Sequence, residues 1–387
     1  MEELAESVPA APVKSLDTEW LIVGAGLHGA HFAIRLLARG VAASDILLLD
    51  PKPIFHRWRT RTSRLQMSHL RSPSVHHIGV APFDLEQFAG KRRRRSRGFR
   101  GPYSRPTLSL FDAHCDRVAH EYALHEMLFR GRATRCEVAS SHLVVHCACG
   151  TSLRTKNIVL ALGVTEPARP ETLPPESCEH ARHVFDERSI ELPKRSTETV
   201  VVVGGGVTGA QLALALVACG NRVELFSRHA LRVAAFDSDP CWIGPSCMEG
   251  FQRERCPNAR RTLINEARNR GTMPADVKRA LVRAREQGSI EIRAGRPIVA
   301  TDLDRREHVF LATGFSPKRP GGPLVDHLIH KGGLPVAPCG YPLVDAQLRW
   351  HPRVFVTGAL AELELGPAAR NITGARHAAE RIVETTQ

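Results

Sequence analysis

The chain has 387 residues and a formal net charge of +13, and 43% of its residues are hydrophobic. The length exceeds that of an ordinary single domain and suits two domains, while the apolar content excludes a largely disordered chain. The positive charge permits partners that carry phosphate groups, such as nucleic acid, anionic membranes or phosphorylated cofactors.

The N-terminal part predicts the opening of a dinucleotide-binding fold. Residues 1–17 are acidic, rich in Ala and Pro and without the apolar core of a secretory signal, so we expect a flexible tail. A buried strand at 19–23, a helix at 25–39 and a second strand at 46–50 follow, and residues 51–89 are expected to be irregular.

The turn between the first strand and the helix has the pattern G-x-G-x-x-G, with its glycines at Gly24, Gly26 and Gly29. In such a turn the first glycine allows the tight bend, the second lets a pyrophosphate approach the backbone, and the third lets helix and strand pack closely. The second strand ends in Asp50, whose carboxylate can accept hydrogen bonds from the ribose hydroxyls of an adenosine. These four residues predict an FAD site.

A basic run follows at residues 91–97, with Arg100 beyond it. Nucleic-acid binding is one interpretation, but Phe99 is the only close aromatic residue and no nucleic-acid-binding signature accompanies the run. We favour a solvated loop near an anionic cofactor and expect no nucleic-acid partner.

The first half of the chain continues as an α/β domain. Apolar spacing predicts a helix over 108–130, and strands are expected around 136–147 and at 157–162. A stretch rich in Pro and Glu at 165–193 is predicted to be a connection.

A second strand–turn–helix begins at Thr199, and its turn holds Gly204, Gly206 and Gly209 in the same pattern. Residues 200–220 carry no charge and can also be interpreted as a membrane span. The glycine cluster after four valines favours strand, turn and helix instead. We therefore predict a second dinucleotide site and no membrane span.

The next strand of this unit, at 222–226, ends without an acid. Ser227 stands where Asp50 stands in the first unit, and Arg228 follows it. A carboxylate would repel a 2′-phosphate, whereas a hydroxyl and a guanidinium bind one. The pair predicts NADPH rather than NADH, and the alternative is that Arg228 is an ordinary surface arginine.

The remaining predicted elements are helices and strands at 260–270, 276–287, 309–311, 354–356 and 368–385. The ten cysteines show no disulfide pattern and indicate free thiols in a reducing cytoplasm. Cys241, Cys247 and Cys256 share one loop-like stretch, but their spacings fit no common zinc motif, so no metal site is expected.

Several segments carry a resemblance to a known family. They are FHRWR at 55–59, LQMSHLRSP at 65–73, YSRP at 103–106, LATGF at 311–315, VTGA at 356–359 and LGPAARN at 365–371. Together they resemble the flavin-dependent, NADPH-using monooxygenases, nearest to the lysine and ornithine N-hydroxylases. The likeness extends from about residue 18 to the C-terminal helix.

The resemblance implies a set of site residues beside the flavin ring. Gln66 falls on the family's glutamine, and Arg71 falls on a lysine that helps to hold the amino-acid substrate. His69 is interpreted either as a contact to substrate or flavin or as an ordinary loop histidine, and the same holds for His77. Trp58 either shields the ring or belongs to the core. Gln66, His69 and Arg71 are the candidate catalytic residues.

The later segments imply contacts from the C-terminal part of the chain. Thr313 and Gly314 belong to the segment that links the nicotinamide domain back to the flavin domain. Gly358, Leu365 and Gly366 belong to the region where the last helix starts near the flavin pyrimidine. The family's Asn-Tyr pair near the nicotinamide has no clear counterpart, which leaves the substrate open.

The sequence thus predicts an α/β fold of two Rossmann-type domains, with an FAD domain at 18–193 and 307–387 and an inserted NADPH domain at 194–306. The cysteines and the N-terminus predict a cytoplasmic protein, and the resemblance implies a monooxygenase that uses FAD, NADPH and O₂. It would hydroxylate a heteroatom, nitrogen above all, of a small amine or amino-acid-like substrate through a C4a-hydroperoxyflavin.

A homo-oligomer is compatible with this interpretation. The alternative function is an NADPH-dependent reductase that passes electrons to a protein or small-molecule acceptor. A third hypothesis is a flavin-binding protein without catalytic activity.

Overall fold

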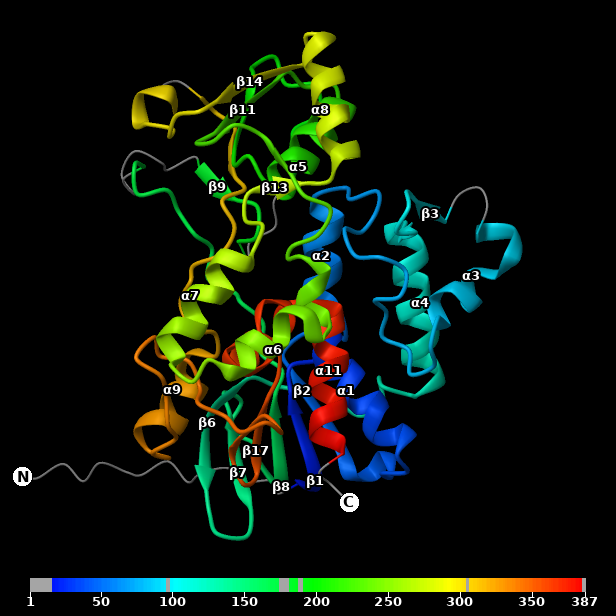
Figure 1. The fold of residues 1–387 in the computed structure, drawn as a ribbon, viewed down its shortest axis with the longest axis vertical. Coiled ribbons are helices and arrows are strands. Elements are labelled where there is room, and N and C mark those ends of the chain that lie inside the picture. The colour runs from blue at the N-terminus through cyan, green and yellow to red at the C-terminus, as the bar shows by residue number, and fades with distance from the viewer. Residues whose placement is uncertain (1–15, 95–97, 174–180, 187–190, 304–305, 385–387) are drawn as a thin grey trace, which may run out of the picture.

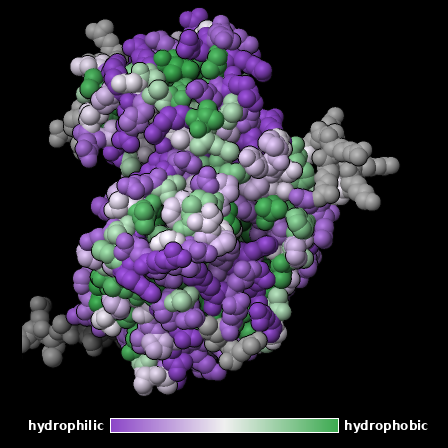
Figure 2. All heavy atoms as spheres, viewed as in Figure 1, coloured by the Kyte–Doolittle hydropathy of each residue, from purple (hydrophilic) through white to green (hydrophobic). Residues whose placement is uncertain are grey.

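The computed structural model describes residues 16–94, 98–173, 181–186, 191–303 and 306–384. The described chain forms two lobes, each built around its own β-sheet (Figure 1). One sheet takes strands from both ends of the chain and the other takes strands from its middle. Polar side chains cover most of the face shown in Figure 2, and apolar ones form small separate groups.

The first sheet has eight strands in the order β16-β17-β8-β1-β2-β5, with β7 and β6 attached through β8. Their bounds are β1 Leu16–Val23, β2 Ile46–Asp50, β5 Leu128–Arg130, β6 Ala133–Val138, β7 Leu143–Cys147, β8 Ser152–Leu160, β16 Arg349–His351 and β17 Val354–Val356. β1 runs parallel to β2 on one side and to β8 on the other. Parallel strands that are covered on both faces are apolar throughout, which explains the continuous apolar run in β1.

Helices cover this sheet, and α1 and α11 lie side by side against it (Figure 1). The helices and short strands of the lobe are α1 Leu27–Ala38, α2 His56–Arg64, α3 Asp84–Arg94, β3 Phe99–Arg100, β4 Arg105–Pro106, α4 Leu108–Glu121, α9 Gly322–His330, α10 Glu362–Leu365 and α11 Ile372–Val383. The side chains of residues 91–94 and all of residues 95–97 lie outside the described part, so the predicted basic loop cannot be placed.

The second sheet has five parallel strands in the order β14-β11-β10-β15-β9. The elements of this lobe are β9 Ala181–His183, β10 Val200–Val203, α5 Val207–Ala218, β11 Val223–Ser227, β12 Arg232–Val233, α6 Pro245–Arg253, α7 Pro257–Ala267, β13 Thr272–Met273, α8 Ala275–Glu286, β14 Ile290–Ala294 and β15 Val309–Leu311. All four residues of β10 are buried valines, as expected for the centre of a parallel sheet.

The chain passes between the lobes at two neighbouring places. After β8 it reaches the second sheet through β9, and after β15 it returns to the first lobe. The predicted borders, 193/194 and 306/307, assign β9 and β15 to the first domain, whereas hydrogen bonding places both strands in the second sheet. The segment at 51–89 also holds a helix, α2, where an irregular stretch was expected.

One cysteine pair departs from the expected free thiols. Cys241 and Cys247 form a disulfide that joins the turn before α6 to its first turn. The other described cysteines are free thiols, in agreement with the prediction. No helix among the described residues is long and apolar enough to cross a bilayer.

Candidate functional site

The first glycine turn has the shape that a pyrophosphate requires. Gly24 has a φ of +109°, and a Cβ there would lie 2.5 Å from the Ala161 carbonyl oxygen. A Cβ on Gly29 would lie 1.8 Å from the Gly24 carbonyl oxygen, so helix α1 packs directly on the turn. A Cβ on Gly26 would meet open space. Gly26 caps α1 without any side-chain hydrogen bond, which leaves the first amides of the helix available to an anion.

Asp50 lies beside this turn at the carboxyl end of β2. Its Oδ2 accepts a hydrogen bond from the amide of Ala25 at 2.9 Å, and its Oδ1 accepts one from the amide of Lys52 at 2.8 Å. Each carboxylate oxygen can accept a further hydrogen bond. The residues around this turn therefore fit the adenosine and pyrophosphate of FAD: they offer a rigid carboxylate, free helix amides and room at Gly26.

The second glycine turn repeats this geometry on β10 and α5. Gly204 has a φ of +138°, and a Cβ there would lie 2.3 Å from the Ala312 carbonyl oxygen. A Cβ on Gly209 would lie 1.9 Å from the Gly204 carbonyl oxygen. Gly206 caps α5, again without a side-chain hydrogen bond. The equivalence of the two turns supports a second dinucleotide site.

The two residues of the Ser-Arg pair at the end of β11 differ in exposure: Ser227 is buried and Arg228 lies on the surface. Ser227 is buried, its hydroxyl donates to the His229 carbonyl at 2.6 Å, and a Cβ on Gly205 would lie 2.0 Å from its oxygen. Arg228 is exposed and makes no hydrogen bond or ion pair with the described residues. Arg228 is therefore the member of the pair that is available to a 2′-phosphate, and Ser227 supports the turn.

The segment predicted to lie beside the flavin ring is anchored at Trp58, whereas Gln66 is exposed. Trp58 of α2 donates its indole N–H to Asp112 Oδ1 at 3.0 Å and packs against Phe111, with ring centroids 5.3 Å apart. Gln66 is exposed, has a φ of +44° and lies near Cys219, with 3.8 Å between Nε2 and Sγ. His69 lies beside Ser68, with Nδ1 3.1 Å from Oγ, and burial lowers the pKa of its imidazole.

Arg71 holds a loop of the second lobe. Its guanidinium donates to the backbone carbonyls of Ala234, Ala235 and Phe236 and to Thr272 Oγ1 at 2.8 Å. Burial lowers the pKa of this guanidinium. Arg71 thus joins the lobes on the side where the resemblance places the substrate, and much of its donor capacity is already used.

The two connections between the lobes lie against each other. Thr313 donates its hydroxyl to the Ala168 carbonyl, and the Ala168 amide donates to the carbonyl of Gly314 at 3.0 Å. The rings of Phe185 and Phe315 stack at 5.0 Å, and the guanidinium of Arg61 lies 4.5 Å from the Phe315 ring. This stack fixes one lobe against the other.

Gly358 and Gly366 both have positive φ angles, of 65° and 72°, close to the start of α11. The His28 ring lies 3.5 Å from the place of a Cβ on Gly358. The Met248 sulfur lies 3.1 Å from the place of a Cβ on Gly366, and Leu365 is buried beside it. Helix α6 of the second lobe therefore packs onto the turn that precedes α11.

A buried ionic cluster also joins the lobes at this point. Glu362 is fully buried and pairs with Arg261, with Arg268 at 3.2 Å and with Arg370 at 2.6 Å. Burial would raise the pKa of Glu362, but Arg370 and then the other two guanidinium groups hold it below its usual value. The Arg261 guanidinium also lies 3.9 Å above the Tyr341 ring.

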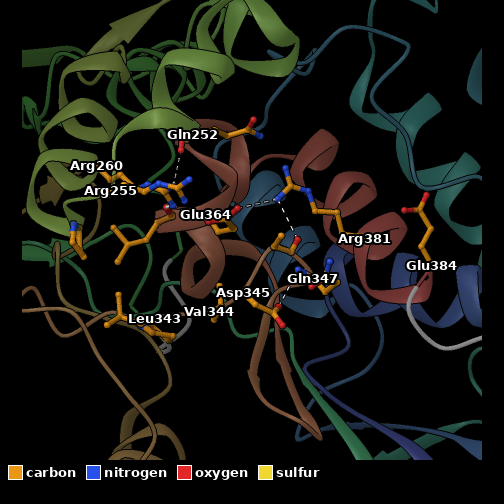
Figure 3. Close-up of a pocket in the computed structure, with 14 residues that line it drawn as sticks. Gln252, Arg255, Arg260, Leu343, Val344, Asp345, Gln347, Glu364, Arg381 and Glu384 are labelled. Carbon is orange, nitrogen blue, oxygen red and sulfur yellow. Dashed lines mark hydrogen bonds and ion pairs between the residues drawn. The ribbon is translucent and has the colours of Figure 1, made fainter.

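A cavity of about 680 Å³ lies between α6, α7 and α11. Figure 3 shows Arg260 and Arg381 on either side of Glu364, to which both are hydrogen-bonded. Neither glycine turn lines this cavity. A second cleft, of about 1400 Å³, is lined by Gln66 and Cys219 and lies under the second sheet. Gln66 therefore faces this cleft.

Some residues of the site carried no signal in the sequence. His28 occupies an unspecified position of the first glycine motif, and its Nδ1 lies 2.9 Å from Thr357 Oγ1. Gly271 approaches the second turn, because a Cβ on Gly206 would lie 3.4 Å from its Cα. Arg61 looks like any other basic residue of α2.

Comparison with known proteins extends this picture. Residues 18–381 match the family model described as pyridine nucleotide-disulphide oxidoreductase. No protein with curated annotation matches the sequence significantly.

Solved structures with the same fold include flavoprotein hydroxylases and a reductase. Ornithine N-hydroxylase from Kutzneria sp. 744 aligns with a TM-score of 0.72 at 16% identity, over 95% of this chain and 98% of that one. The cadaverine monooxygenase of desferrioxamine biosynthesis from Erwinia amylovora aligns with a TM-score of 0.70 at 14% identity, over 95% and 94%. Bacillithiol disulfide reductase from Bacillus cereus aligns with a TM-score of 0.59 at 17% identity, over 95% and 98%. At these identities the likeness establishes the two-domain α/β fold.

Proposed function

The chain belongs to the pyridine nucleotide-disulphide oxidoreductase family, and on that premise we propose that it is an FAD-dependent, NADPH-using monooxygenase. Its substrate would be a small amine or amino-acid-like molecule that is hydroxylated on nitrogen or another heteroatom. The observation that carries the proposal is the pair of glycine turns. Each turn precedes a helix whose first amides receive no side-chain hydrogen bond, and Asp50 follows the neighbouring strand at one turn while Arg228 follows it at the other.

The division of cofactors follows from charge. The carboxylate of Asp50 suits the unphosphorylated ribose of FAD, and the exposed guanidinium of Arg228 suits the 2′-phosphate of NADPH. When bound, FAD would take up hydride from NADPH and supply activated oxygen to the substrate. The chain itself orients the two cofactors, excludes water and holds the substrate.

The relative position of the lobes is the chain's main contribution. Arg71, the Glu362 cluster and the stack of Arg61 on Phe315 fix the second lobe from three separate places. Such bracing favours one distance between the cofactors. The Nε and Nη2 atoms of Arg71 already donate to the second lobe. We propose that its remaining N–H groups contribute to the substrate site.

The alternative is an NADPH-dependent flavoprotein reductase. The chain shares its fold with a bacillithiol disulfide reductase, so the fold is compatible with this alternative as well. Two observations favour the monooxygenase. The fold agrees better with the two N-hydroxylating enzymes, at TM-scores of 0.72 and 0.70, than with the reductase at 0.59 or with a flavin-containing monooxygenase from Stenotrophomonas maltophilia at 0.57. The described disulfide spans six positions, Cys241 to Cys247, rather than a C-x-x-C pair.

The test is made on purified protein under air. NADPH oxidation, oxygen uptake and peroxide release are followed together, with and without a panel of diamines and basic amino acids. We expect a flavin spectrum, a preference for NADPH, and one substrate that lowers peroxide release while its hydroxylated product appears. Rapid flavin reduction with little oxygen uptake until a disulfide or carrier protein is added would establish the reductase instead.

A further inference from the structure

His77 is buried without a partner for either ring nitrogen. Its side chain is 2% exposed, and neither Nδ1 nor Nε2 has a hydrogen-bond partner among the described residues. A buried polar group that is left unpaired costs about 1–3 kcal/mol. An apolar residue at this position would avoid this cost. The unpaired ring nitrogens of His77 therefore suggest that a ligand binds there.

Two more side chains with ligand atoms surround it. His114 is fully buried with its Nδ1 unpaired, and its ring lies edge-on to that of His77 at 5.6 Å between centroids. Asp84 completes the group, and one ligand atom from each residue lies within 4.8 Å of the others. The three come from separate segments: the stretch before α3, the first residue of α3 and the middle of α4.

We propose that His77, Asp84 and His114 bind a divalent transition-metal ion, and that Zn²⁺ is the ion. Two imidazole nitrogens and one carboxylate oxygen are a common zinc ligand set, with a fourth position left for water. Fe²⁺ is bound by the same set in other proteins, and the test includes it. The site shares no residue with the two glycine turns.

The carboxylate ligand is held in place by a neighbouring side chain. Arg117 donates to Asp84 Oδ2, which orients the carboxylate.

Three features set the limits of the site. In the described arrangement His114 Nε2 lies 2.8 Å from Asp84 Oδ2, so both atoms must turn toward an incoming ion. The positive charges of Arg117 and Arg376 oppose that ion. A Cβ on Gly79 would lie 1.9 Å from Asp84 Oδ2, so the backbone closes the site on that side. The ion would tie the stretch before α3 to α4.

The test uses the full chain with its flavin, freed of metal by chelator dialysis and then exposed to Zn²⁺ or Fe²⁺ at equal concentrations. Retained metal is measured by elemental mass spectrometry after gel filtration, and the Tm is measured with and without metal. We expect the wild type to retain about one more zinc per chain than His77→Leu. We also expect zinc to raise the wild-type Tm by about 4 °C and to leave that of His77→Leu unchanged.

His77→Leu is the deciding variant, because removing an unpaired imidazole breaks no hydrogen bond of the described chain. Asp84→Asn should also lose the extra zinc. His146→Leu is the control, since half-buried His146 pairs with Glu137 and Ser152 away from the three ligands, and this variant should keep the zinc. Surface thiols bind zinc equally in all variants and cancel in the difference.

Equal zinc retention and equal Tm shifts in wild type and His77→Leu would overturn the site. Retention of Fe²⁺ but not Zn²⁺ would overturn the choice of ion. Flavin content is recorded separately. A wild type without flavin but with the His77-dependent zinc would refute the proposed function and leave the metal site standing.

Discussion

The Nδ1 atom of His28 lies 2.9 Å from the hydroxyl oxygen of Thr357, which joins the first turn of α1 to the turn after β17. The backbone of Arg370 and Asn371, immediately before α11, lies close to the same ring. One imidazole thus connects the glycine turn to both C-terminal segments that the resemblance places beside the flavin. Burial lowers its pKa to about 4, so it is neutral at pH 7.

Replacing His28 with Leu should weaken FAD binding by about tenfold, because hydrogen bonds worth about 1 kcal/mol each are lost around the cofactor. His28→Asn keeps a polar atom near the Nδ1 position and should lose less. The measurement is the FAD dissociation constant from flavin fluorescence. Equal affinities for wild type and His28→Leu would show that this connection does not serve FAD.

The two glycine turns should fail independently. In Gly29→Ala the new methyl group would overlap the Gly24 carbonyl oxygen at 1.8 Å, and in Gly209→Ala it would overlap the Gly204 carbonyl oxygen at 1.9 Å. We expect the first variant to be purified without FAD. The second should keep FAD while its KM for NADPH rises at least about tenfold. Loss of FAD from Gly209→Ala alone would reverse the assignment of the two sites, and loss from both variants would contradict their independence.

Arg228→Ala should reduce the preference for NADPH over NADH. A charge-assisted hydrogen bond to a phosphate is worth about 1.5–3 kcal/mol, so the ratio of kcat/KM values should fall by roughly 10- to 100-fold. Most of the change should be in KM for NADPH. Arg222→Ala, an exposed arginine at the other end of the same strand, is the control. An unaltered ratio would make Arg228 an ordinary surface residue.

Glu362→Gln should destabilise the protein by about 3–5 kcal/mol, because it leaves three partly buried guanidinium groups without their counter-charge. Denaturant unfolding followed by both flavin fluorescence and circular dichroism measures this loss. Glu291→Gln removes an exposed partner of Arg293 and should cost less than about 0.5 kcal/mol. A similar loss in the two variants would mean that the cluster adds little.

Stability should fall as the pH is lowered from 7 to 5. Burial lowers the pKa of His31 to about 3 and that of His28 to about 4, against 6.5 in the unfolded chain. Between these values the unfolded state binds more protons than the folded state, so the free energy of unfolding decreases with decreasing pH. We expect the Tm to drop by roughly 5 °C. His31→Gln should reduce this slope, whereas replacement of the exposed His125 should not, and a pH-independent Tm would contradict the assignment.

The parts of the fold that sequence could predict are those governed by local pattern. β2, β15 and β17 have the predicted bounds, because short apolar runs between turn residues leave little freedom in a parallel sheet. Helix α2 was missed. Its residues are mostly basic and polar, and it starts after Phe55, which has a positive φ and offers no side-chain cap. Nothing in such a segment shows an apolar face.

The site residues divide in the same way. The glycines of both turns and Asp50 lie where their motifs place them, because the backbone alone determines that geometry. The partners of Arg71 and His28 lie far away in the chain, so no local pattern reveals them. The Cys241–Cys247 disulfide also escaped the pattern, since its spacing belongs to no common framework.

The adjacency of the two inter-lobe connections has a consequence for modularity. Pro167 on the outgoing connection forms an isolated antiparallel β-bridge with Phe315 on the returning one. The chain therefore enters and leaves the second lobe through neighbouring residues. A short peptide between these positions would close the first lobe on itself without stretching it. The second lobe is thus an insertion with a single point of attachment in the chain, and a substitute for it must supply the partners that Arg71 and Glu362 have there.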